Sequence, residues 1–329
     1  MASGGLVAFP TETVYGLGAD AGSDVAVAQI FAAKGRPADH PLIVHVADAA
    51  AADYFAASMP EFARKLIAAF WPGPLTVIVP RKQGVAAASA GGQNSIGLRC
   101  PSHSMALELL RACAERGVRG LAAPSANKFG KVSPTTAQHV RDELGSALTV
   151  LDGGACSVGI ESTIIDCTRG APVLLRPGVL EPQRIEAVMG CKLLLNDELL
   201  PQHSEGLETE SAPNLAVKTA PRASGTLESH YAPNARVRLM DAKALQTALD
   251  LLGEDAANMA VYSRAIMASK SGRIIRRRMP DDALATAQQL FAVLREFDAK
   301  GVKLIWIETL PVDAAWDGVR DRLQRAAAS

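Results

Sequence analysis

Four short polar stretches of this chain combine cations, hydroxyls and amides with Gly or Pro at the end of an apolar run. They are Phe9-Pro10-Thr11-Glu12-Thr13-Val14-Tyr15-Gly16-Leu17, Lys34-Gly35-Arg36-Pro37, Ala123-Pro124-Ser125-Ala126-Asn127 and Gly159-Ile160-Glu161-Ser162-Thr163. In α/β proteins, strand ends present backbone and side-chain donors into one crevice, where phosphorylated ligands bind. Four such stretches in one chain indicate a nucleotide-handling enzyme.

Two of the stretches are suited to phosphate. Lys34 and Arg36 stand at the end of a predicted helix, and a guanidinium can bind two phosphate oxygens at once. Taken alone, such a pair more often offsets the macrodipole at a helix C-terminus. Ser125, Asn127 and Ser133 offer hydroxyls and an amide to phosphate oxygens, although the same residue types form ordinary turns. No Walker motif occurs in the chain.

Other residues are suited to a small charged ligand. Arg99 and Arg176 each end an apolar run, where an arginine holds either a ligand carboxylate or a structural salt bridge. Ser162 stands in no Gly-x-Ser-x-Gly elbow, so ligand hydrogen bonding is its better functional interpretation. His45 ends another apolar run, where a hydrogen-bonded core histidine is commoner than a catalyst. No His/Cys cluster predicts a metal cage, and Mg²⁺ carried by nucleotide phosphates needs none.

An α/β domain is predicted to position these residues over 1–190. The predicted strands cover 6–9, 42–46, 75–79, 95–99, 120–123, 149–151, 163–167 and 173–175. The predicted helices cover 23–34, 60–71, 103–116 and 135–144, with Ser23 as the N-cap of the first. The number and spacing of the strands favour a mixed sheet, part parallel and part antiparallel.

The rest of the chain is predicted to be a linker over 191–235 and a smaller Rossmann-like domain over 236–329. Polar residues without a sustained period dominate 196–229. Strands are expected at 236–240, 258–263, 273–279 and 303–307, and helices at 242–252, 281–300 and from 314 onward. One face of the long helix is expected to be apolar, formed by Leu284, Ala287, Leu290, Phe291, Leu294 and Phe297. The glycine fingerprint of dinucleotide-binding domains is missing.

Composition sets limits on the function. Lys and Arg together equal Asp and Glu together at 34 each, so no global field favours nucleic acid or an anionic membrane. The apolar runs are far shorter than a membrane span, and the first residues do not form a signal peptide. The five cysteines form no Cys-x-x-Cys pair and are expected to be reduced packing residues. A cytoplasmic protein is therefore expected.

Several stretches of the chain resemble those of a known protein family. Residues 9–17, 34–46, 71–76, 122–127, and 159–164 followed by 174–178 closely resemble the YrdC-type domain of threonylcarbamoyl-AMP synthases. The likeness runs in order from about Gly4 to Met189. Residues 224–226 and 229–234 resemble the linker of the two-domain members, and 322–327 resemble the end of their second domain.

The resemblance implies an ATP-dependent condensation. L-Threonine and bicarbonate give an N-carboxylated threonine, whose carboxylate attacks the α-phosphate of ATP. The products are threonylcarbamoyl-adenylate and pyrophosphate, with Mg²⁺ entering on ATP. A downstream tRNA threonylcarbamoyl transferase then modifies adenosine in tRNA, so this chain itself requires no tRNA or membrane contact.

The resemblance also implies site residues. The threonine-binding residues would be Thr13, His45, Arg99, Ala123, Ser162 and Arg176. The ATP-binding residues would be Lys34, Arg36, His40, Ser95, Ser125, Asn127, Ser133 and Asn234. Lys34 and Arg36 are the best candidates for a catalytic role, which would consist of positioning and charge stabilisation. His40 departs from the family pattern, which more often has a smaller amide or hydroxyl residue there. The chain also begins almost at the first strand, where the family normally has a preceding helix.

Two other functions are compatible with parts of the pattern. An RNA-binding protein would use the concave surface of the YrdC-like domain, but zero net charge and few aromatic residues argue against it. A carbamoyltransferase related to hydrogenase maturation factors would share the fold. Those proteins carry additional zinc-finger regions, which the cysteines of this chain exclude.

Overall fold

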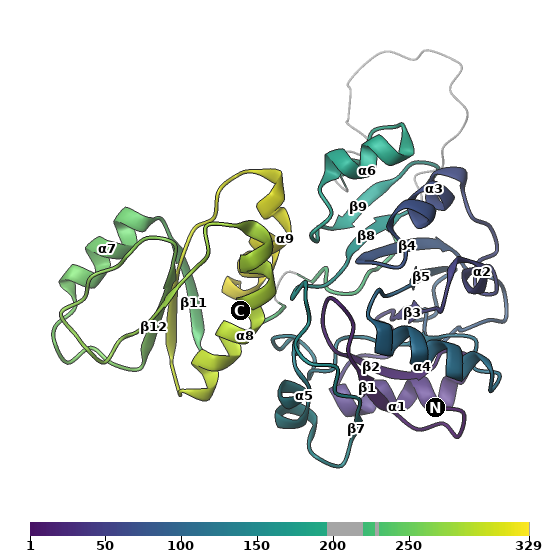
Figure 1. Ribbon diagram of the computed structural model, residues 1–329, viewed down its shortest axis with the longest axis horizontal. Coiled ribbons are helices and arrows are strands. Elements are labelled where there is room, and N and C mark those ends of the chain that lie inside the picture. Colours follow the sequence, from purple (N-terminus) through teal and green to yellow (C-terminus); the bar gives the residue numbers. More distant parts are fainter. Residues whose placement is uncertain (196–219, 228–229, 329) are drawn as a thin grey trace.

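The computed structural model describes residues 1–195, 220–227 and 230–328, and they form two α/β domains that lie side by side (Figure 1). The strands of the first domain are β1 (Val7–Phe9), β2 (Gly16–Asp20), β3 (Ile43–His45), β4 (Leu75–Pro80), β5 (Ser95–Arg99), β6 (Leu121–Ala122), β7 (Thr149–Val150), β8 (Thr163–Asp166), β9 (Val173–Arg176) and β10 (Leu194–Leu195). Its helices are α1 (Asp24–Lys34), α2 (Ala49–Ala52), α3 (Glu61–Phe70), α4 (Ser104–Ala114), α5 (Ala137–Leu144) and α6 (Pro182–Met189).

The strands of the first domain form one mixed sheet in the order β10-β9-β8-β4-β5-β3-β6-β2-β1-β7. The pairs β3–β5 and β4–β8 are parallel, whereas β4–β5, β3–β6 and β2–β6 are antiparallel. This arrangement confirms the mixed α/β class expected from the sequence. Because β3, β5 and β6 are direct neighbours, residues at and just beyond their ends come together.

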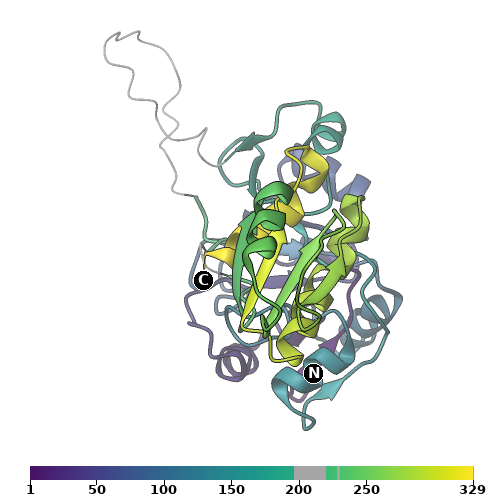
Figure 2. The ribbon, with the colours of Figure 1, turned by 90° about the vertical axis from the view of Figure 1, so that its left-hand side faces the viewer.

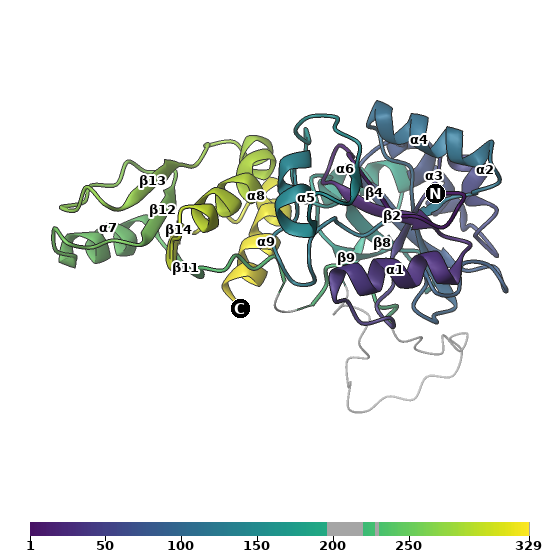
Figure 3. The same cartoon turned by 90° about the horizontal axis from the view of Figure 1, so that it is seen from below.

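Helices cover both faces of this sheet. Ala8 and Ala122 belong to the core that includes α1, whereas Phe9 and Leu121 pack beneath α4. Successive residues of a strand point to opposite faces, so this alternation places α1 and α4 on opposite sides. Figure 3 shows the two helices on either side of β2.

The second domain consists of β11 (Arg236–Met240), α7 (Ala242–Leu251), β12 (Met259–Ser263), β13 (Ile275–Arg278), α8 (Ala283–Ala299), β14 (Leu304–Glu308), a 3₁₀ turn over Ala314–Trp316 and α9 (Asp317–Ala327). All of its strands are parallel, in the order β11-β14-β12-β13. The sheet lies between α7 on one side and α8 and α9 on the other, and α8 and α9 face the first domain (Figures 1 and 2). This parallel sheet fits the predicted Rossmann-like character.

The predicted face of the long helix needs one correction. Ala287, Leu290, Phe291, Leu294 and Phe297 are buried, but Leu284 is 61% exposed. Ala283, one position earlier than Leu284, is buried in the first turn instead, together with Thr286. Ser23, in contrast, caps α1 as expected, because its hydroxyl accepts a hydrogen bond from the Ala26 backbone amide.

The described residues contain several elements that the sequence pattern did not predict: β2, β10, α2 and α6. Residues 196–219 and 228–229, which fall within the predicted linker and its second motif, lie outside the described residues. Among the helices of the described residues, none combines the length and apolar character needed to cross a bilayer.

The two domains share a closely packed interface. Ile160 of the first domain belongs to the same core cluster as Tyr231, Phe291 and Leu323. A Cβ on Gly318 of α9 would lie only 2.4 Å from the Gly178 carbonyl oxygen. Backbones therefore approach each other across the interface with no room for a side chain.

Replacing Gly318 by Ala tests this close approach. In an isolated helix the change stabilises by up to about 1 kcal/mol, but here the added methyl displaces backbone and should cost about 1–3 kcal/mol. The midpoint of urea unfolding should fall. Gly253→Ala is the matched control, because nothing lies within 4 Å of its added Cβ. Equal midpoints for the two variants would show that the interface is not tightly packed.

Candidate active site

A solvent-open hollow of about 510 Å³ lies where the four polar stretches of the sequence meet. It is lined by Thr11, Val14, Gly16, Arg36, Ile43, His45, Arg99, Ala123, Pro124, Ser125, Glu161, Ser162, Arg176, Ser224, Gly225, His230 and Tyr231. Each stretch contributes at least one lining residue. The last four lining residues come from the segment that leads into the second domain.

The end of α1 is shaped by Gly35. This residue adopts the left-handed conformation at a φ of 62°, and the backbone amides of Gly35 and Arg36 donate to the carbonyls of Ala32 and Phe31. Glycine adopts this conformation without a steric penalty, which is why it so often ends a helix. The turn leaves Lys34 buried behind the pocket wall, while Arg36 lines the pocket itself.

Lys34 is buried next to the polar stretch 123–127 and supports it through hydrogen bonds. Its Nζ donates to the carbonyl oxygens of Ser125, at 2.5 Å, and of Asn127. Burial disfavours the ammonium form and Arg36 adds repulsion, so the pKa of Lys34 falls to about 7. Lys34 therefore fixes the loop that carries Ser125.

Arg36 and Arg176 are buried cations whose hydrogen bonds go to neutral oxygens. Arg36 donates to the Pro41 carbonyl at 3.0 Å and to the Ser224 hydroxyl at 3.4 Å. Arg176 donates to the carbonyls of Ser162 (2.9 and 3.1 Å) and Ser224 (2.8 Å). Within the described residues neither has a carboxylate partner. Burial lowers the pKa of Arg36 to about 10, so it stays charged at neutral pH.

Arg99 combines the two interpretations that the sequence left open. Its Nη2 pairs with Glu12 Oε1 at 2.7 Å, and the guanidinium also lines the pocket. The other oxygen of Glu12 accepts from the Ser102 backbone amide at 3.0 Å. Arg99 is thus held in place by a buried carboxylate while it faces the hollow.

His45 lies beside Arg99 as a neutral imidazole. Burial, with a further contribution from Arg99, lowers the pKa of His45 to about 3. Its ring packs edge-on against Phe9, and its Nδ1 has no hydrogen-bond partner in the described part of the chain. The imidazole can therefore hydrogen-bond a ligand in this pocket without adding charge.

The hydroxyls of the pocket are organised in pairs. Ser162 Oγ lies 2.7 Å from Thr76 Oγ1 and accepts from Arg176 at 3.2 Å. Neither of these partners is a general base, which fits ligand binding better than nucleophilic attack. Thr13 is fully buried and bonded to Thr11 Oγ1 at 2.9 Å, so it is Thr11 that lines the hollow.

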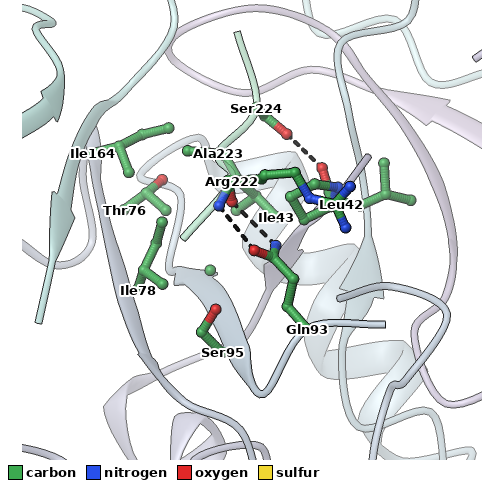
Figure 4. A pocket seen from close by; sticks show the side chains of 12 residues that line it. Leu42, Ile43, Thr76, Ile78, Gln93, Ser95, Ile164, Arg222, Ala223 and Ser224 are labelled. Atoms are coloured by element: carbon green, nitrogen blue, oxygen red, sulfur yellow. Dashed lines mark hydrogen bonds between the residues drawn. The ribbon is translucent and has the colours of Figure 1, made fainter. Parts of the chain in front are cut away.

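A second, smaller hollow of about 280 Å³ adjoins the first and shares Ile43 and Ser224 with it. Ser95 and Thr76 line it from β5 and β4, as Figure 4 shows. Gln93 forms two hydrogen bonds with the backbone of Arg222 across its rim, at 2.8 and 3.2 Å. Residues 222–224 therefore lie along the boundary between the two hollows.

The remaining predicted residues do not line the pocket. Ser133 Oγ donates to Glu161 Oε1 at 2.5 Å, and Asn127 Nδ2 donates to the carbonyls of Lys128 and Lys131. His40 packs edge-on against Phe129, which also lies under Arg36. Asn234 lies further away, where it accepts a hydrogen bond from Lys131. The predicted roles of these residues stay predictions.

Sequence reasoning assigned no ligand role to Glu161, Thr76 or Ser224, all of which line a hollow. All three stand inside motifs of the resemblance, so their position in the motifs was the available signal. In the described residues, no group of three or more His, Cys, Asp or Glu side chains could hold a metal ion. The cysteines are unpaired, and all but Cys191 are buried.

Comparison with known proteins agrees with this architecture. Residues 1–178 match the family model described as telomere recombination, which covers Sua5, YciO and YrdC. Residues 181–328 match the model described as the threonylcarbamoyl-AMP synthase C-terminal domain. The threonylcarbamoyl-AMP synthase of Pyrococcus abyssi is 36% identical over 331 residues, which cover 98% of this chain and 91% of that protein. The chain belongs to the threonylcarbamoyl-AMP synthase family.

Further members of the family support the same conclusion. The threonylcarbamoyl-AMP synthase of Bacillus subtilis is also 36% identical to this chain. The aligned residues cover 98% of this chain and 89% of the B. subtilis protein. The crystal structure of P. abyssi Sua5 complexed with L-threonine superimposes with a TM-score of 0.83 at 36% identity. It covers 99% of this chain and 91% of the P. abyssi chain. The enzyme class and the two-domain fold predicted from the sequence are therefore confirmed.

The low pKa of Lys34 predicts a pH-dependent stability. Since the lysine pKa is about 7 when folded and 10.5 ordinarily, the unfolded chain binds more protons between these values. The free energy of unfolding should therefore rise with pH from 7 to 8.5, by at most about 1.4 kcal/mol per pH unit.

Urea unfolding of the wild type and of Lys34→Met measures this effect, because other titrations cancel in the difference between them. The wild type should gain stability relative to the variant as the pH rises. A difference that does not change with pH would contradict a neutral-range pKa for Lys34.

Proposed function

We propose that the pocket of the first domain is the place where this family's reaction occurs: the ATP-dependent condensation of L-threonine and bicarbonate to threonylcarbamoyl-adenylate. The observation that carries the proposal is the pair Arg36 and Arg176. Both are buried and charged, and both are bonded to neutral oxygens in the described residues. Such cations favour an anionic ligand strongly, because little solvent screens them.

The reaction requires two anions to be brought together. The threonine nitrogen attacks bicarbonate carbon, a C–N bond forms and water leaves, which yields the N-carboxylated amino acid. One oxygen of this carboxylate then forms a bond to the α-phosphorus of ATP, and the bond from that phosphorus to the bridging oxygen breaks. The pyrophosphate leaves with the electron pair. Positive charge and positioning lower this barrier more than a general base would.

Threonine is proposed to bind at the inner end of the pocket. Arg99, oriented by Glu12, would pair with its carboxylate, and the neutral His45 would accept or donate a hydrogen bond without adding charge. Ser162 and Ala123 would complete this part, with Thr13 acting through Thr11. The bound L-threonine of P. abyssi Sua5 supports the presence of an amino-acid site in the family.

ATP is proposed to bind across Arg36, Ser125 and the Ser95 side of the second hollow. Its phosphate oxygens would replace the Ser224 hydroxyl as a partner of Arg36, while Arg176 would contact threonine, as the resemblance implies. Lys34, Asn127 and Ser133 would support the residues that line the pocket without lining it themselves. His40 and Asn234 would contact only the periphery of ATP. Mg²⁺ is proposed to enter as part of the nucleotide substrate, since the described residues offer no acidic cluster to retain it.

The product is a mixed anhydride of a carbamate and a phosphate, which hydrolyses readily in water. A downstream transferase acting on tRNA adenosine is therefore the proposed consumer, and the cytoplasm, where tRNA and ATP are available, the proposed location. The RNA-binding function weighed from the sequence has no support from the comparisons. It predicts salt-sensitive RNA retention with no release of pyrophosphate.

The deciding experiment measures pyrophosphate release by the purified full chain with ATP, Mg²⁺, threonine and bicarbonate. Omission of threonine or of bicarbonate should each abolish most of the release, and EDTA should do the same. Chromatography should recover threonylcarbamoyl-adenylate. Release that is independent of threonine would indicate a different acceptor for the nucleotide.

Arg36→Ala should lower pyrophosphate release by about a hundredfold or more, the usual effect of removing one donor to the transition state. Arg64→Ala is the matched control, because among the residues that the structure describes the Arg64 side chain forms only an exposed ion pair with Asp53, at 3.3 Å. The control should stay close to wild type. Near-normal turnover by a folded Arg36→Ala variant would refute the assignment of Arg36.

A further inference from the structure

Glu161 poses an electrostatic problem for a pocket that binds anions. Its side chain is buried and lines the hollow, directly beside Ser162. The proposed ligands, a triphosphate and an amino-acid carboxylate, both carry negative charge. An uncompensated carboxylate in this wall would repel them, and low solvent access would make that repulsion large.

The compensating charge comes from the second domain. Arg322 of α9 is 1% exposed, and its Nε donates to Glu161 Oε2 at 2.9 Å. Its Nη2 donates to the Glu161 backbone carbonyl at 3.1 Å, and its Nη1 to the Pro177 carbonyl at 2.8 Å. The same Nη1 also pairs with Asp321 of α9 at 2.7 Å, and Asp321 in turn pairs with Arg325. One guanidinium thus binds both polypeptide segments, 159–162 and 176–178, that carry Ser162 and Arg176.

The other charged groups near Glu161 are consistent with this arrangement. Burial opposes ionisation of Glu161, but Arg322, Arg176 and the Ser133 hydrogen bond together hold its pKa below the ordinary value. Lys34 and His230 also interact electrostatically with Glu161 from the first domain and the connecting segment. The ring of Tyr231 lies under Arg322 at 5.2 Å. Glu161 is therefore an ionised carboxylate whose direct ion-pair partner is Arg322.

Close backbone packing between the two domains holds the Glu161–Arg322 contact in place. A Cβ on Gly159 would lie 2.4 Å from the Ala287 carbonyl oxygen of α8, and one on Gly318 as close to Gly178. Arg295 of α8 adds a salt bridge to Glu143 at 3.1 Å and a hydrogen bond to the Val132 carbonyl. The loop that carries Glu161 and Ser162 is therefore fixed against α8 and α9 of the second domain.

We propose that Arg322 is a positioning residue for the reaction: it neutralises Glu161 from across the domain interface, so that the pocket can accept its anionic substrates. This inference rests on the proposed function of the pocket. It gives the second domain a defined task in the first domain's chemistry. Loss of Arg322 should then weaken substrate binding through charge more than it slows the chemical step.

The test measures pyrophosphate release at a temperature where circular dichroism shows every variant folded. Arg322→Met should raise the KM for ATP by about tenfold or more, with kcat changed much less, because a like charge now faces the nucleotide. The double variant Arg322→Met/Glu161→Gln should recover most of the lost affinity, since it removes the carboxylate left unpaired in the pocket wall, whereas Asp321 keeps its ion pair with Arg325. Arg320→Met is the matched control, because the hydrogen bonds of Arg320 within the described part of the chain stay in its own domain, to Asp317 and to the carbonyls of Pro311 and Asp313.

The results distinguish a failure of the Arg322 proposal from a failure of the proposed function of the pocket. If Arg322 merely holds α9 in place, Glu161→Gln will not restore the KM, and the proposal is wrong. An unchanged KM in folded Arg322→Met would also overturn it. Should Arg322→Met alone fail to fold, the double variant decides: it must then fold and bind ATP with near wild-type KM. A wild-type chain without threonine-dependent release would instead refute the proposed function of the pocket.

Discussion

Buried positive charge held by neutral oxygens is the constraint on which the rest of this structure depends. Arg36 and Arg176 are bonded to carbonyl and hydroxyl oxygens, while Arg99 and Arg322 are held by Glu12 and Glu161. The first pair leaves its charge available to a ligand, and the second pair leaves the carboxylates of the wall neutralised. A protein with no net charge thereby acquires a local anion site.

This distribution of charge explains why the two domains are packed so closely. The walls of the pocket include loops at the ends of strands, and loops are more mobile than the elements that they connect. In this chain the loop containing Glu161 is fixed by Arg322 and by contacts through Gly159 and Gly318. The second domain stabilises a site to which its own sheet contributes no residue among those that line the hollow.

Several elements could not be predicted from the sequence, for identifiable reasons. The strand β2 has the sequence Gly-Leu-Gly-Ala-Asp, which has no β-branched residue, and it exists because β1 and β6 pair with it on both sides. Helix α6 buries only Ile185 and Met189, too few for a recognisable period. Leu284 fits the apolar face of α8 by spacing, yet it is exposed, and Ala283 one position earlier is the residue turned toward the core.

The sequence by itself determined the family and its reaction through the resemblance of its motifs, and the mixed α/β class because residue types in strands and at helix caps follow local rules. It also identified the arginines that surround the pocket. Only the tertiary structure decided which of them are paired and which are free of a carboxylate, and it placed Arg322 against Glu161. That contact joins residues 161 positions apart, and no local pattern specifies which side chains of two folded domains will meet.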